Sequence, residues 1–288
     1  MGPRVRKAQR SRAEVSQLRR PYLAWSPSTD DGIVTPSTIC PVGARGGEIT
    51  VVLVVPCFNE ASRLEMDRLV ELDAAGIGLV LVDDGSTDAT RLMLEQWASS
   101  HDHTTVHILD RNAGKGEAVR VGLLAAVARK PGWVGFIDAD FATPPAALLQ
   151  LIELARQRDN LDVVLGSRVA MLGRDIERSA FRHYTGRVFA TFAAVVLGFP
   201  VYDSQCGAKL FRCTDPLVRA LGEPFASRWG FDVELIGRLV RSGTPVNAFW
   251  EEPLEYWHDI SDSRRTLWAS VRSCFELVRI RSRLRSWR

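Results

Sequence analysis

Long apolar runs are missing from this chain of 288 residues, and their absence excludes several classes of protein. No stretch reaches the roughly 18 consecutive apolar residues that a membrane-spanning helix requires. The longest candidate, residues 189–201, is shorter and ends in a turn that contains proline. No apolar segment follows the basic residues near the N-terminus, so a secretory signal peptide is not predicted either. We therefore expect that the chain does not cross a membrane.

Cysteine is scarce and is not arranged in pairs. The five cysteines are Cys40, Cys57, Cys206, Cys213 and Cys274, an odd number with no C-x-x-C motif among them. A disulfide framework and a cysteine-based metal cage are therefore not expected, and a reducing, cytoplasmic environment is favoured.

Two glycine-rich phosphate-binding motifs are also absent. The chain has neither the G-x-x-x-x-G-K-[ST] loop nor the G-x-G-x-x-G fingerprint. Their absence argues against a P-loop nucleotide hydrolase and against a conventional dinucleotide-binding fold. Hydrophobic residues nevertheless make up 46% of the chain, which is enough for a folded domain with a substantial core.

Positive charge is concentrated at the two ends of the chain. Residues 1–20 contain seven Lys or Arg and one acid, and residues 264–288 contain eight Arg and one acid. The part between them holds 22 basic and 32 acidic residues. Basic ends suit an anionic membrane surface or nucleic acid, and merely solvated charge is an equally good interpretation of the N-terminal end.

Apolar strands and helices are predicted to alternate from residue 48 onward, after a loosely ordered basic arm at 1–47. Strands are predicted at 49–55, 78–82, 106–109, 133–137 and 163–165, and helices near 60–74, 88–99, 115–129 and 145–157. Continuous apolar strands of this kind are typical of a mostly parallel sheet covered by helices on both faces. The sequence thus predicts a doubly wound α/β domain over 48–263, in which ligands bind beyond the carboxyl ends of the strands.

Polar clusters follow four of the predicted strands at the points where these strands end. They read PCFNE at 56–60, DDGSTD at 83–88, DADFATPP at 138–145 and GSR at 166–168. Each cluster alone fits a capped turn, in which Gly85 would supply a positive φ. Four clusters at one edge of a sheet together predict a binding site.

The third cluster places Asp138 and Asp140 one residue apart. At a strand end this spacing puts both carboxylates on the same face. Their mutual repulsion would be offset by a hard divalent cation such as Mg²⁺, which proteins commonly hold with one or two carboxylates plus phosphate oxygens of a substrate.

Seven sequence blocks resemble the inverting family-2 glycosyltransferases, and in particular the polyprenyl (dolichyl) phosphate β-glucosyltransferase branch. The blocks are VVPCFNEASRL, LVDDGSTDAT, RNAGKGEAVRVG, DADFATP, LGSR, DSQCGAKLFR and RWGFDVELI, and they follow one another in the family's order. The resemblance implies a nucleotide-sugar-binding fold of the GT-A type. It also implies a nucleoside diphosphate sugar as donor, with UDP-glucose favoured, and Mg²⁺ or Mn²⁺ as cofactor.

The same resemblance assigns roles to individual residues. Asp138 and Asp140 would hold the metal and, with Ala139 between them, the ribose and diphosphate of the donor. Further nucleotide-sugar contacts are implied for Pro56, Phe58, Glu60, Asp83, Asp84, Lys115, Gln205, Lys209 and Trp229. Catalytic roles are implied for Asp232, Glu234, Arg168 and Arg264, with the arginines as partners of phosphate or sugar oxygens.

A C-terminal landmark of the branch, W-x-E-I-P-G-S-K, corresponds here to WHDISDSR at 257–264. Ser261 and Asp262 replace Pro-Gly, and Arg264 replaces Lys. We expect this loop to close over the diphosphate through Arg264.

Two roles remain open for Asp232, which stands at the start of the predicted helix GFDVEL. It is the candidate general base for a neutral hydroxyl acceptor, or it is simply an acid that the dipole favours at a helix N-terminus. A phosphate monoester is already an anion at neutral pH and needs no base.

The C-terminal segment 264–288 is predicted to be a basic amphipathic helix. Apolar residues recur at helical spacing, at Trp268, Val271, Cys274, Phe275 and Val278, and arginines accompany them. This pattern is typical of a helix that lies on a membrane surface, with packing on the catalytic domain as the alternative. For the apolar segment 180–199, contact with a prenyl chain and packing on the core are equally supported.

The predicted function is transfer of a hexose to a polyprenyl phosphate, with peripheral contact on the cytoplasmic face of an anionic membrane. The alternative keeps the donor chemistry but uses a soluble small-molecule or nucleoside hydroxyl acceptor. A non-catalytic basic protein that binds nucleic acid would explain the charged ends but not the four polar clusters. No nucleic-acid partner is therefore expected.

Overall fold

The computed structural model describes residues 51–177, 180–258 and 267–287, and the side chains of 177, 180–183 and 267–275 lie outside the description. The described residues belong to one compact unit, Gly32–Arg288, and the other unit of the chain is Met1–Asp31. The predicted arm at 1–47 and the predicted catalytic residue Arg264 lie outside the described residues.

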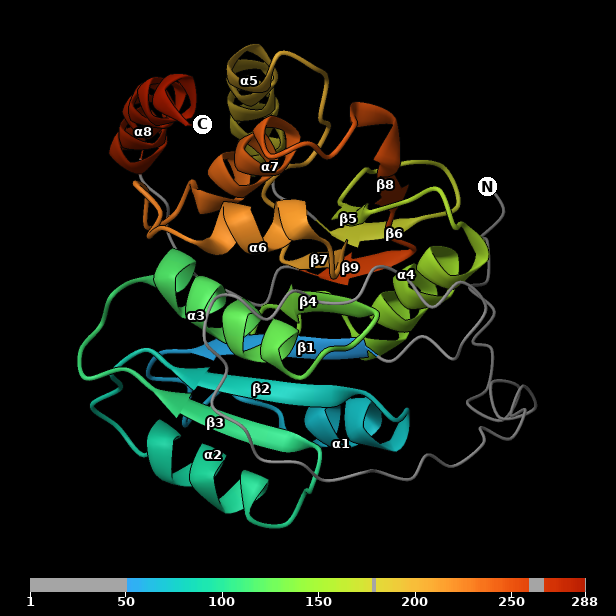
Figure 1. The fold of residues 1–288 in the computed structure, drawn as a ribbon, viewed down its shortest axis with the longest axis vertical. Helices are drawn as coiled ribbons and strands as arrows, with labels where there is room; N and C mark the ends of the chain where they lie inside the picture. The colour runs from blue at the N-terminus through green and yellow to red at the C-terminus, as the bar shows by residue number, and fades with distance from the viewer. Residues whose placement is uncertain (1–50, 178–179, 259–266, 288) are drawn as a thin grey trace, which may run out of the picture. The chain divides into compact units, whose positions relative to one another are not determined.

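A seven-stranded sheet forms the centre of the described domain (Figure 1), with the strand order β3-β2-β1-β4-β7-β5-β8. Its strands are β1 (Val51–Cys57), β2 (Gly78–Asp83), β3 (Thr104–Ile108), β4 (Trp133–Ile137), β5 (Val163–Ser167), β7 (Ala208–Arg212) and β8 (Phe249–Pro253). Strands β1 to β4 pair in parallel, β7 runs antiparallel to its neighbours β4 and β5, and β5 pairs in parallel with β8. A separate small sheet joins β6 (Asp175–Glu177) to β9 (Tyr256–His258).

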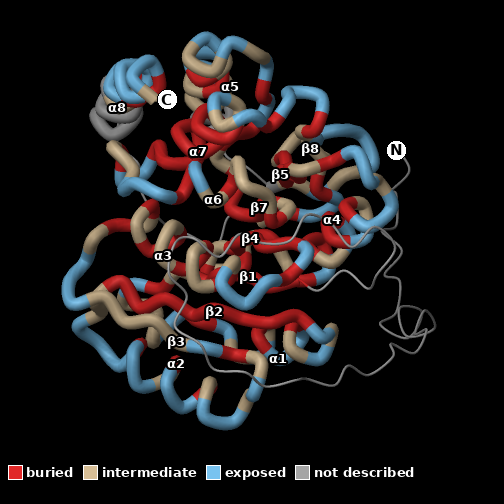
Figure 2. The backbone as a smooth tube through the Cα atoms, viewed as in Figure 1, coloured by how far each residue is buried: buried red, intermediate tan, exposed pale blue. Residues whose placement is uncertain are grey.

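Helices cover both faces of the large sheet. The helices are α1 (Met66–Ala74), α2 (Thr90–Ala98), α3 (Lys115–Ala128), α4 (Pro145–Gln157), α5 (Ala180–Leu197), α6 (Asp215–Leu221), α7 (Phe231–Arg241) and α8 (Leu267–Ser286). Side chains of α1, α2 and α4 share one core cluster with Leu53 and Val55 of β1, and those of α3, α6 and α7 share a second cluster with Val52 and Val54. Successive residues of β1 thus serve opposite faces, as the two-residue period of a strand requires. Figure 2 shows these strands as the buried centre of the domain.

Helices α5 and α8 pack beside α7 around a third apolar cluster. Leu277, Ile280 and Leu284 of α8 are buried in this cluster. Gly237 of α7 permits the close approach, because a Cβ there would lie 2.4 Å from a methyl carbon of Leu284. The described side chains of α8 therefore pack on the α/β domain, which is the alternative predicted for this segment.

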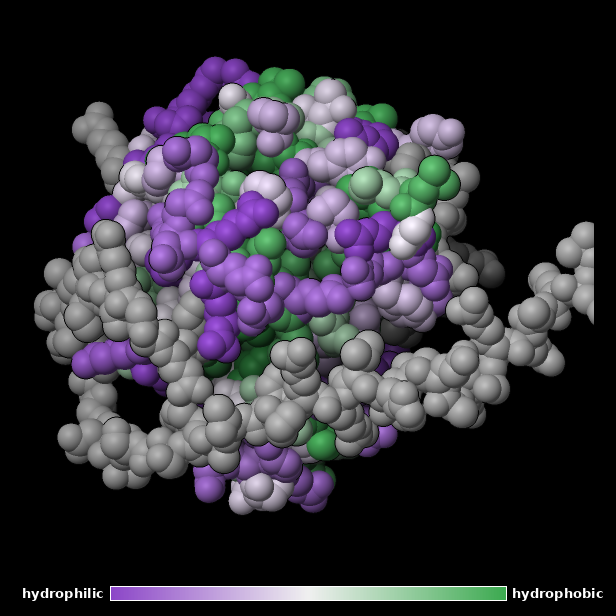
Figure 3. Space-filling model, turned by 90° about the vertical axis from the view of Figure 1, so that its right-hand side faces the viewer, coloured by the Kyte–Doolittle hydropathy of each residue, from purple (hydrophilic) through white to green (hydrophobic). Residues whose placement is uncertain are grey.

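One side of α5 is apolar and exposed. Tyr184, Val188, Phe192 and Val195 recur at helical spacing, and each is more than half exposed, so they form a stripe along one face of the helix. Apolar surface is visible at the top of Figure 3, the level at which α5 lies in Figure 1. Contiguous exposed apolar surface is typical of interaction surfaces.

The predicted fold class, a mostly parallel α/β sheet covered on both faces, is confirmed. The five predicted strands are β1 to β5 and the four predicted helices are α1 to α4, although α1 begins at Met66 rather than near residue 60. Strands β7 and β8 were not predicted, because Lys209 interrupts the apolar pattern of β7 and two acids interrupt that of β8. No helix in the described ranges has both the length and the apolar character that a bilayer-spanning helix needs.

Candidate active site

The loops that follow β1 and β2 are joined by hydrogen bonds between backbone and side chains. The N–H of Asn59 donates to Ser86 Oγ (2.9 Å), and Asn59 Oδ1 accepts from the N–H of Thr87 (2.9 Å). Asn59 has a φ of 54°, a left-handed conformation that asparagine adopts more readily than most residues. The N–H of Glu60 also donates to Thr90 Oγ1 (2.8 Å). The first two predicted polar clusters therefore form one connected rim.

Asp83 and Asp84 at the end of β2 are both buried, and their carboxylates shape the adjoining loops. Asp84 accepts hydrogen bonds from the N–H groups of Ala113 (2.7 Å) and Gly114 (2.9 Å). Asp83 accepts from the N–H of Ser86 (3.2 Å). Burial raises the pKa of Asp84, and its backbone hydrogen bonds oppose this shift. Asp84 thus holds the loop before α3, and its contact with the nucleotide sugar stays a prediction.

Gly85 follows these acids and has the predicted positive φ, 68°. A Cβ at this position would lie 2.5 Å from the backbone carbonyl carbon of Arg111. Glycine is therefore required both by the left-handed conformation and by the approach of the next loop.

The third polar cluster carries Asp138 and Asp140 on a tight turn after β4. The N–H of Asp138 donates to the carbonyl of Gly207 (3.0 Å), and the N–H of Phe141 donates to the carbonyl of Asp138 (3.0 Å). Gly207 is needed at this contact, because a Cβ there would lie 2.1 Å from Asp138 Oδ2. Both acidic residues remain partly exposed at the edge of the sheet.

Lys115, the first residue of α3, forms an ion pair with Asp138, with 2.6 Å between Nζ and Oδ1. The two side chains are 27% and 30% exposed, and the paired oxygen, Asp138 Oδ1, is itself buried. Burial lowers the pKa of the Lys115 amine, but the carboxylates of Asp138, Asp232 and Asp140 raise it by more, and the net shift is upward. Lys115 therefore remains charged at the centre of the acidic group.

Asp140 and Glu60 extend the acidic group around Asp138. Burial raises the pKa of Asp140, and the charge of Asp138 raises it further. Burial also raises the pKa of Glu60, although its pairing with Arg63 opposes the shift. Glu60 Oε2 is buried and accepts no hydrogen bond within the described residues. Crowded carboxylates and an unsatisfied buried oxygen indicate a place where a cation would fit.

Asp138 and Asp140 are the residues best placed to hold such a cation. Within the described ranges, no three Asp, Glu, His or Cys side chains come together in an arrangement that would hold a metal ion by themselves. Two carboxylates supply only part of the coordination sphere of Mg²⁺ or Mn²⁺, and substrate phosphate oxygens commonly supply more. The pair therefore fits a divalent ion that binds together with a diphosphate.

Arg168, directly after β5, is held by Asp203 through a bidentate ion pair. The distances are 2.6 Å from Nε to Oδ2 and 2.8 Å from Nη2 to Oδ1. Asp203 is oriented in turn by Glu251 of β8, which accepts from its backbone N–H (2.8 Å). Burial lowers the pKa of the Arg168 guanidinium, but the Asp203 carboxylate raises it by more.

Asp203 is a site residue that the sequence analysis missed. It is the first residue of the block DSQCGAKLFR, and membership of this block was the sequence signal that could have identified it. Its importance depends on its partner Arg168, which lies 35 residues earlier in the chain. The structure alone brings these two residues together.

Asp232, the second residue of α7, contacts Lys209 and Gln205. Lys209 Nζ lies 2.7 Å from Asp232 Oδ1 and also donates to the carbonyl of Cys206. Gln205 Nε2 donates to Asp232 Oδ2 (3.3 Å). Asp232 is 5% exposed and Lys209 is fully buried. Burial raises the pKa of Asp232, and the charge of Lys209 opposes this shift.

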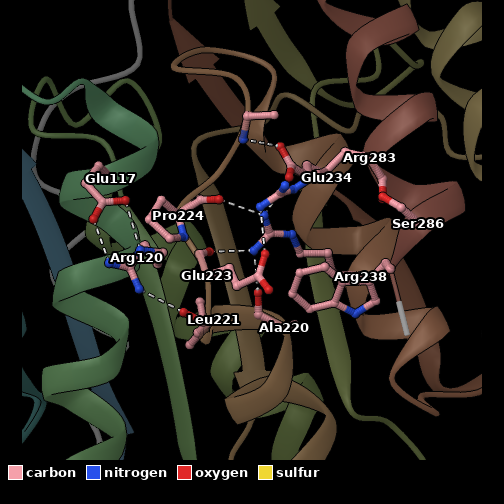
Figure 4. Close-up of polar contacts among 12 residues, drawn as sticks. Glu117, Arg120, Ala220, Leu221, Glu223, Pro224, Glu234, Arg238, Arg283 and Ser286 are labelled. Atoms are coloured by element: carbon pink, nitrogen blue, oxygen red, sulfur yellow. Dashed lines mark hydrogen bonds and ion pairs between the residues drawn. The ribbon is translucent and has the colours of Figure 1, made fainter.

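Glu234, two residues further along α7, belongs to a different network (Figure 4). Its carboxylate is fully buried, lies 2.6 Å from Arg238 Nη2 and accepts from the N–H of Ala226 (2.8 Å). The guanidinium of Arg238 also donates to the carbonyls of Ala220, Glu223 and Pro224. The position of Glu234 does not support the predicted catalytic role, because its carboxylate is used to pack α7 against the preceding segment.

The remaining predicted site residues differ in exposure. Phe58 and Trp229 are exposed, Pro56 is half-buried, and Ala139 is buried in the core cluster. The segment that carries Trp229 is tied to the loop before α3, because the carbonyl of Arg228 accepts from the N–H of Gly116 (3.2 Å).

Parallel strands that end in an acidic D-x-D turn, covered by helices on both faces, are the architecture of GT-A glycosyltransferases. A solved structure with this fold is glucosyl-3-phosphoglycerate synthase from Mycobacterium tuberculosis, in complex with Mn²⁺ and UDP-glucose. The likeness has a TM-score of 0.59 and 21% sequence identity, and it covers 81% of this chain and 79% of that one. Residues 52–215 match Glycosyl transferase family 2, and the chain belongs to this family.

Curated relatives of the chain share a narrower description. A dolichyl-phosphate beta-glucosyltransferase of Drosophila melanogaster is 30% identical over 256 residues, which are 82% of this chain and 76% of the relative. A dolichyl-phosphate beta-glucosyltransferase of Trichomonas vaginalis is 28% identical over 274 residues, 90% of this chain and 77% of the relative. The predicted family and branch are confirmed, and the protein is a glycosyltransferase.

Proposed function

We propose that this enzyme transfers a hexose from a nucleoside diphosphate sugar, with UDP-glucose favoured, to a polyprenyl phosphate, with inversion at the anomeric carbon. Similarity to dolichyl-phosphate beta-glucosyltransferases over most of their length supports the acceptor class. UDP-glucose bound to a protein of the same fold supports the donor. The engagement of Asp232 in a buried ion pair is the structural observation that carries the proposal.

Asp232 is the candidate general base, and its surroundings disfavour that role. A neutral hydroxyl acceptor needs a base that is free to take its proton. Lys209 and Gln205 already contact the two carboxylate oxygens of Asp232, and only 5% of this residue is exposed. A phosphate acceptor carries its own negative charge and therefore fits this site better than a hydroxyl does.

Departure of the nucleoside diphosphate requires positive charge close to its phosphates. Mg²⁺ or Mn²⁺ held by Asp138 and Asp140 would supply a Lewis acid there when bound. Arg168, which Asp203 keeps oriented, is suited to the oxygens of the phosphate or the sugar. We assign the closing role at the diphosphate to Arg264, which lies outside the described residues.

The direct test is a product assay with UDP- and GDP-sugars, Mn²⁺ and a short polyprenyl phosphate. We expect labelled glucose from UDP-glucose to enter the organic phase only when the lipid phosphate is present. The Asp232→Asn variant leaves Lys209 without its ion pair, so it is assayed at a temperature at which circular dichroism shows it folded; there it should lose less than about tenfold in kcat, because a phosphate acceptor needs no base. Label that stays in the aqueous phase on a soluble acceptor, together with a loss of about a thousandfold in Asp232→Asn, would instead establish a hydroxyl acceptor.

The exposed stripe on α5 suits the surface of a membrane that contains the lipid acceptor. Arg281 of α8 lies at one end of the stripe, where its Nη1 donates to the carbonyl of Val195 (3.4 Å). Exposed apolar residues next to arginines are typical of surfaces that bind anionic lipid peripherally. We propose peripheral contact on the cytoplasmic face through α5 and the arginines of α8.

Cosedimentation with vesicles tests this contact. Replacing Val188, Phe192 and Val195 together by Ser should reduce binding to anionic vesicles, since it removes apolar surface that would enter the interface. The same triple variant should keep its thermal unfolding midpoint, because these side chains are exposed. Unchanged cosedimentation would show that this stripe does not bind the membrane.

A further inference from the structure

Lys115 occupies an unusual position for a cation. It is the first residue of α3, where the helix dipole disfavours positive charge. An acid in the same turn, Glu117, does not pair with it, because Glu117 pairs with Arg120 (2.6 Å). What holds the Lys115 ammonium is Asp138, one of the two acids of the D-x-D turn.

In the ion pair between Lys115 and Asp138, each side chain can be reached by a ligand that would replace the other. Both side chains are more than a quarter exposed, so that a ligand can reach both of them, although the paired oxygen, Asp138 Oδ1, is itself buried. The pair between Glu234 and Arg238, by contrast, is fully buried on both sides. Asp138 keeps its position without Lys115, because its backbone N–H is bound to Gly207 and its carboxylate fits the space that this glycine leaves.

We propose that Lys115 is a resident counter-ion of Asp138, which a divalent metal replaces only when the nucleoside diphosphate binds with it. The inference rests on the proposed use of a metal and a nucleotide donor. A metal ion alone must compete with the ammonium group for Asp138 and is repelled by its charge. A diphosphate offers the ammonium group new oxygen partners, so metal and nucleotide strengthen each other's binding.

Titration of Mn²⁺ in the absence of nucleotide tests the proposal, with the electron paramagnetic resonance signal of free Mn²⁺ as readout. The Lys115→Met variant should bind Mn²⁺ about tenfold more tightly than the wild-type chain, because a neighbouring positive charge is removed from a partly hydrated site. Addition of UDP should tighten Mn²⁺ binding in the wild-type chain and much less in Lys115→Met, since binding couplings are reciprocal.

Three further variants separate the effect of charge at this position from other effects and test where the ion binds. Lys130→Met removes an exposed lysine beyond the other end of α3, ~20 Å along the helix, and should leave Mn²⁺ binding unchanged. Lys115→Arg keeps the charge and should bind Mn²⁺ as weakly as the wild-type chain. In a Lys115→Met, Asp138→Asn double variant the gain in Mn²⁺ affinity should disappear, which would place the gained ion at Asp138.

Unchanged or weaker Mn²⁺ binding in Lys115→Met, with an unchanged thermal midpoint, would overturn the proposal. A lower midpoint together with weaker Mn²⁺ binding would also overturn it, because Lys115 would then be a structural partner of the turn. Both results are independent of the acceptor. If the protein makes no lipid product, Mn²⁺ and Lys115 can still compete for Asp138. If it does glucosylate the lipid, this competition can still be absent.

Discussion

Two ion pairs in this enzyme have the same chemistry and opposite surroundings. Lys115 and Asp138 meet at the edge of the sheet, where their side chains are 27% and 30% exposed. Glu234 and Arg238 meet inside the domain, where neither side chain is exposed. Figure 4 shows the buried pair surrounded by backbone carbonyls that accept from the Nη1 and Nη2 groups of Arg238.

The difference separates charge used for binding from charge used for packing. A ligand can reach both side chains of the partly exposed pair, so that pair can be remade around a substrate. A buried pair cannot lose one partner without leaving an uncompensated charge in a dry environment. Asp232 and Glu234 lie two residues apart on α7, yet only the Asp232 carboxylate contacts other predicted site residues, Gln205 and Lys209.

The largest expected effect is the loss of the buried pair. Arg238→Met should lower the free energy of unfolding by about 3–5 kcal/mol, because it leaves Glu234 charged and unpaired in the core. Urea unfolding followed by circular dichroism measures this change.

A matched control with the same four-residue spacing is available on α2. Arg91→Met breaks the pair with Glu95, in which the Arg91 side chain is 59% exposed and the Glu95 side chain is 42% exposed, and should cost less than about 1 kcal/mol. Equal losses in the two variants would contradict the distinction between the buried and the hydrated pairs.

An intermediate effect is expected for the pair between Arg168 and Asp203, whose side chains are 14% and 8% exposed. Asp203→Asn should lower kcat by about ten- to a hundredfold, because the Arg168 guanidinium loses the partner that orients it toward the substrate. Steady-state kinetics with UDP-glucose measure the loss.

Exposed Asp175 offers a comparison for this variant. Asp175→Asn changes a side chain that is 63% exposed and should leave kcat within twofold of wild type, roughly the variation of a surface substitution. If Asp203→Asn changed only the unfolding midpoint and not kcat, Asp203 would belong to the packing group with Glu234.

The smallest expected effect concerns pH. Burial raises the pKa of Asp232 above its ordinary value of 3.8, so the folded state holds this proton at pH values where the unfolded chain has released it. The stability that this proton contributes is present below pH 3.8 and is lost as the pH rises through the raised pKa.

Comparison with Asp232→Asn removes this contribution together with the ion pair to Lys209, so the pH dependence of the difference, and not its size, reports the proton. The stability of the wild-type chain should fall relative to the variant as the pH rises through that range, and the difference should then level off. Urea unfolding of both proteins at closely spaced pH values measures it. A difference that is independent of pH would mean that Asp232 has the same pKa in the folded and unfolded chain.

The first half of the domain was predictable because its signals are local. Apolar strands such as 133–137 end at polar residues within a few positions, and parallel strands bring those ends to one edge. This local pattern is sufficient to predict Asp138 and Asp140 as site residues without knowledge of the side chains that contact them. The strands of the second half were harder to predict, because charged residues interrupt their apolar pattern. Lys209 of β7 is buried beside Asp232. Glu251 of β8 accepts a hydrogen bond from the backbone of Asp203.

The order of elements and the edge at which the site lies follow from the sequence by itself, because strand period and turn chemistry act over a few residues. Which charges bind and which ones pack was decided only by the tertiary structure. Glu234 and Arg238 stand four residues apart, a spacing that predicts a helical pair, but nothing local shows that α8 and the 220–226 segment bury it. Burial is a property of what surrounds a side chain, and the surroundings come from distant parts of the chain.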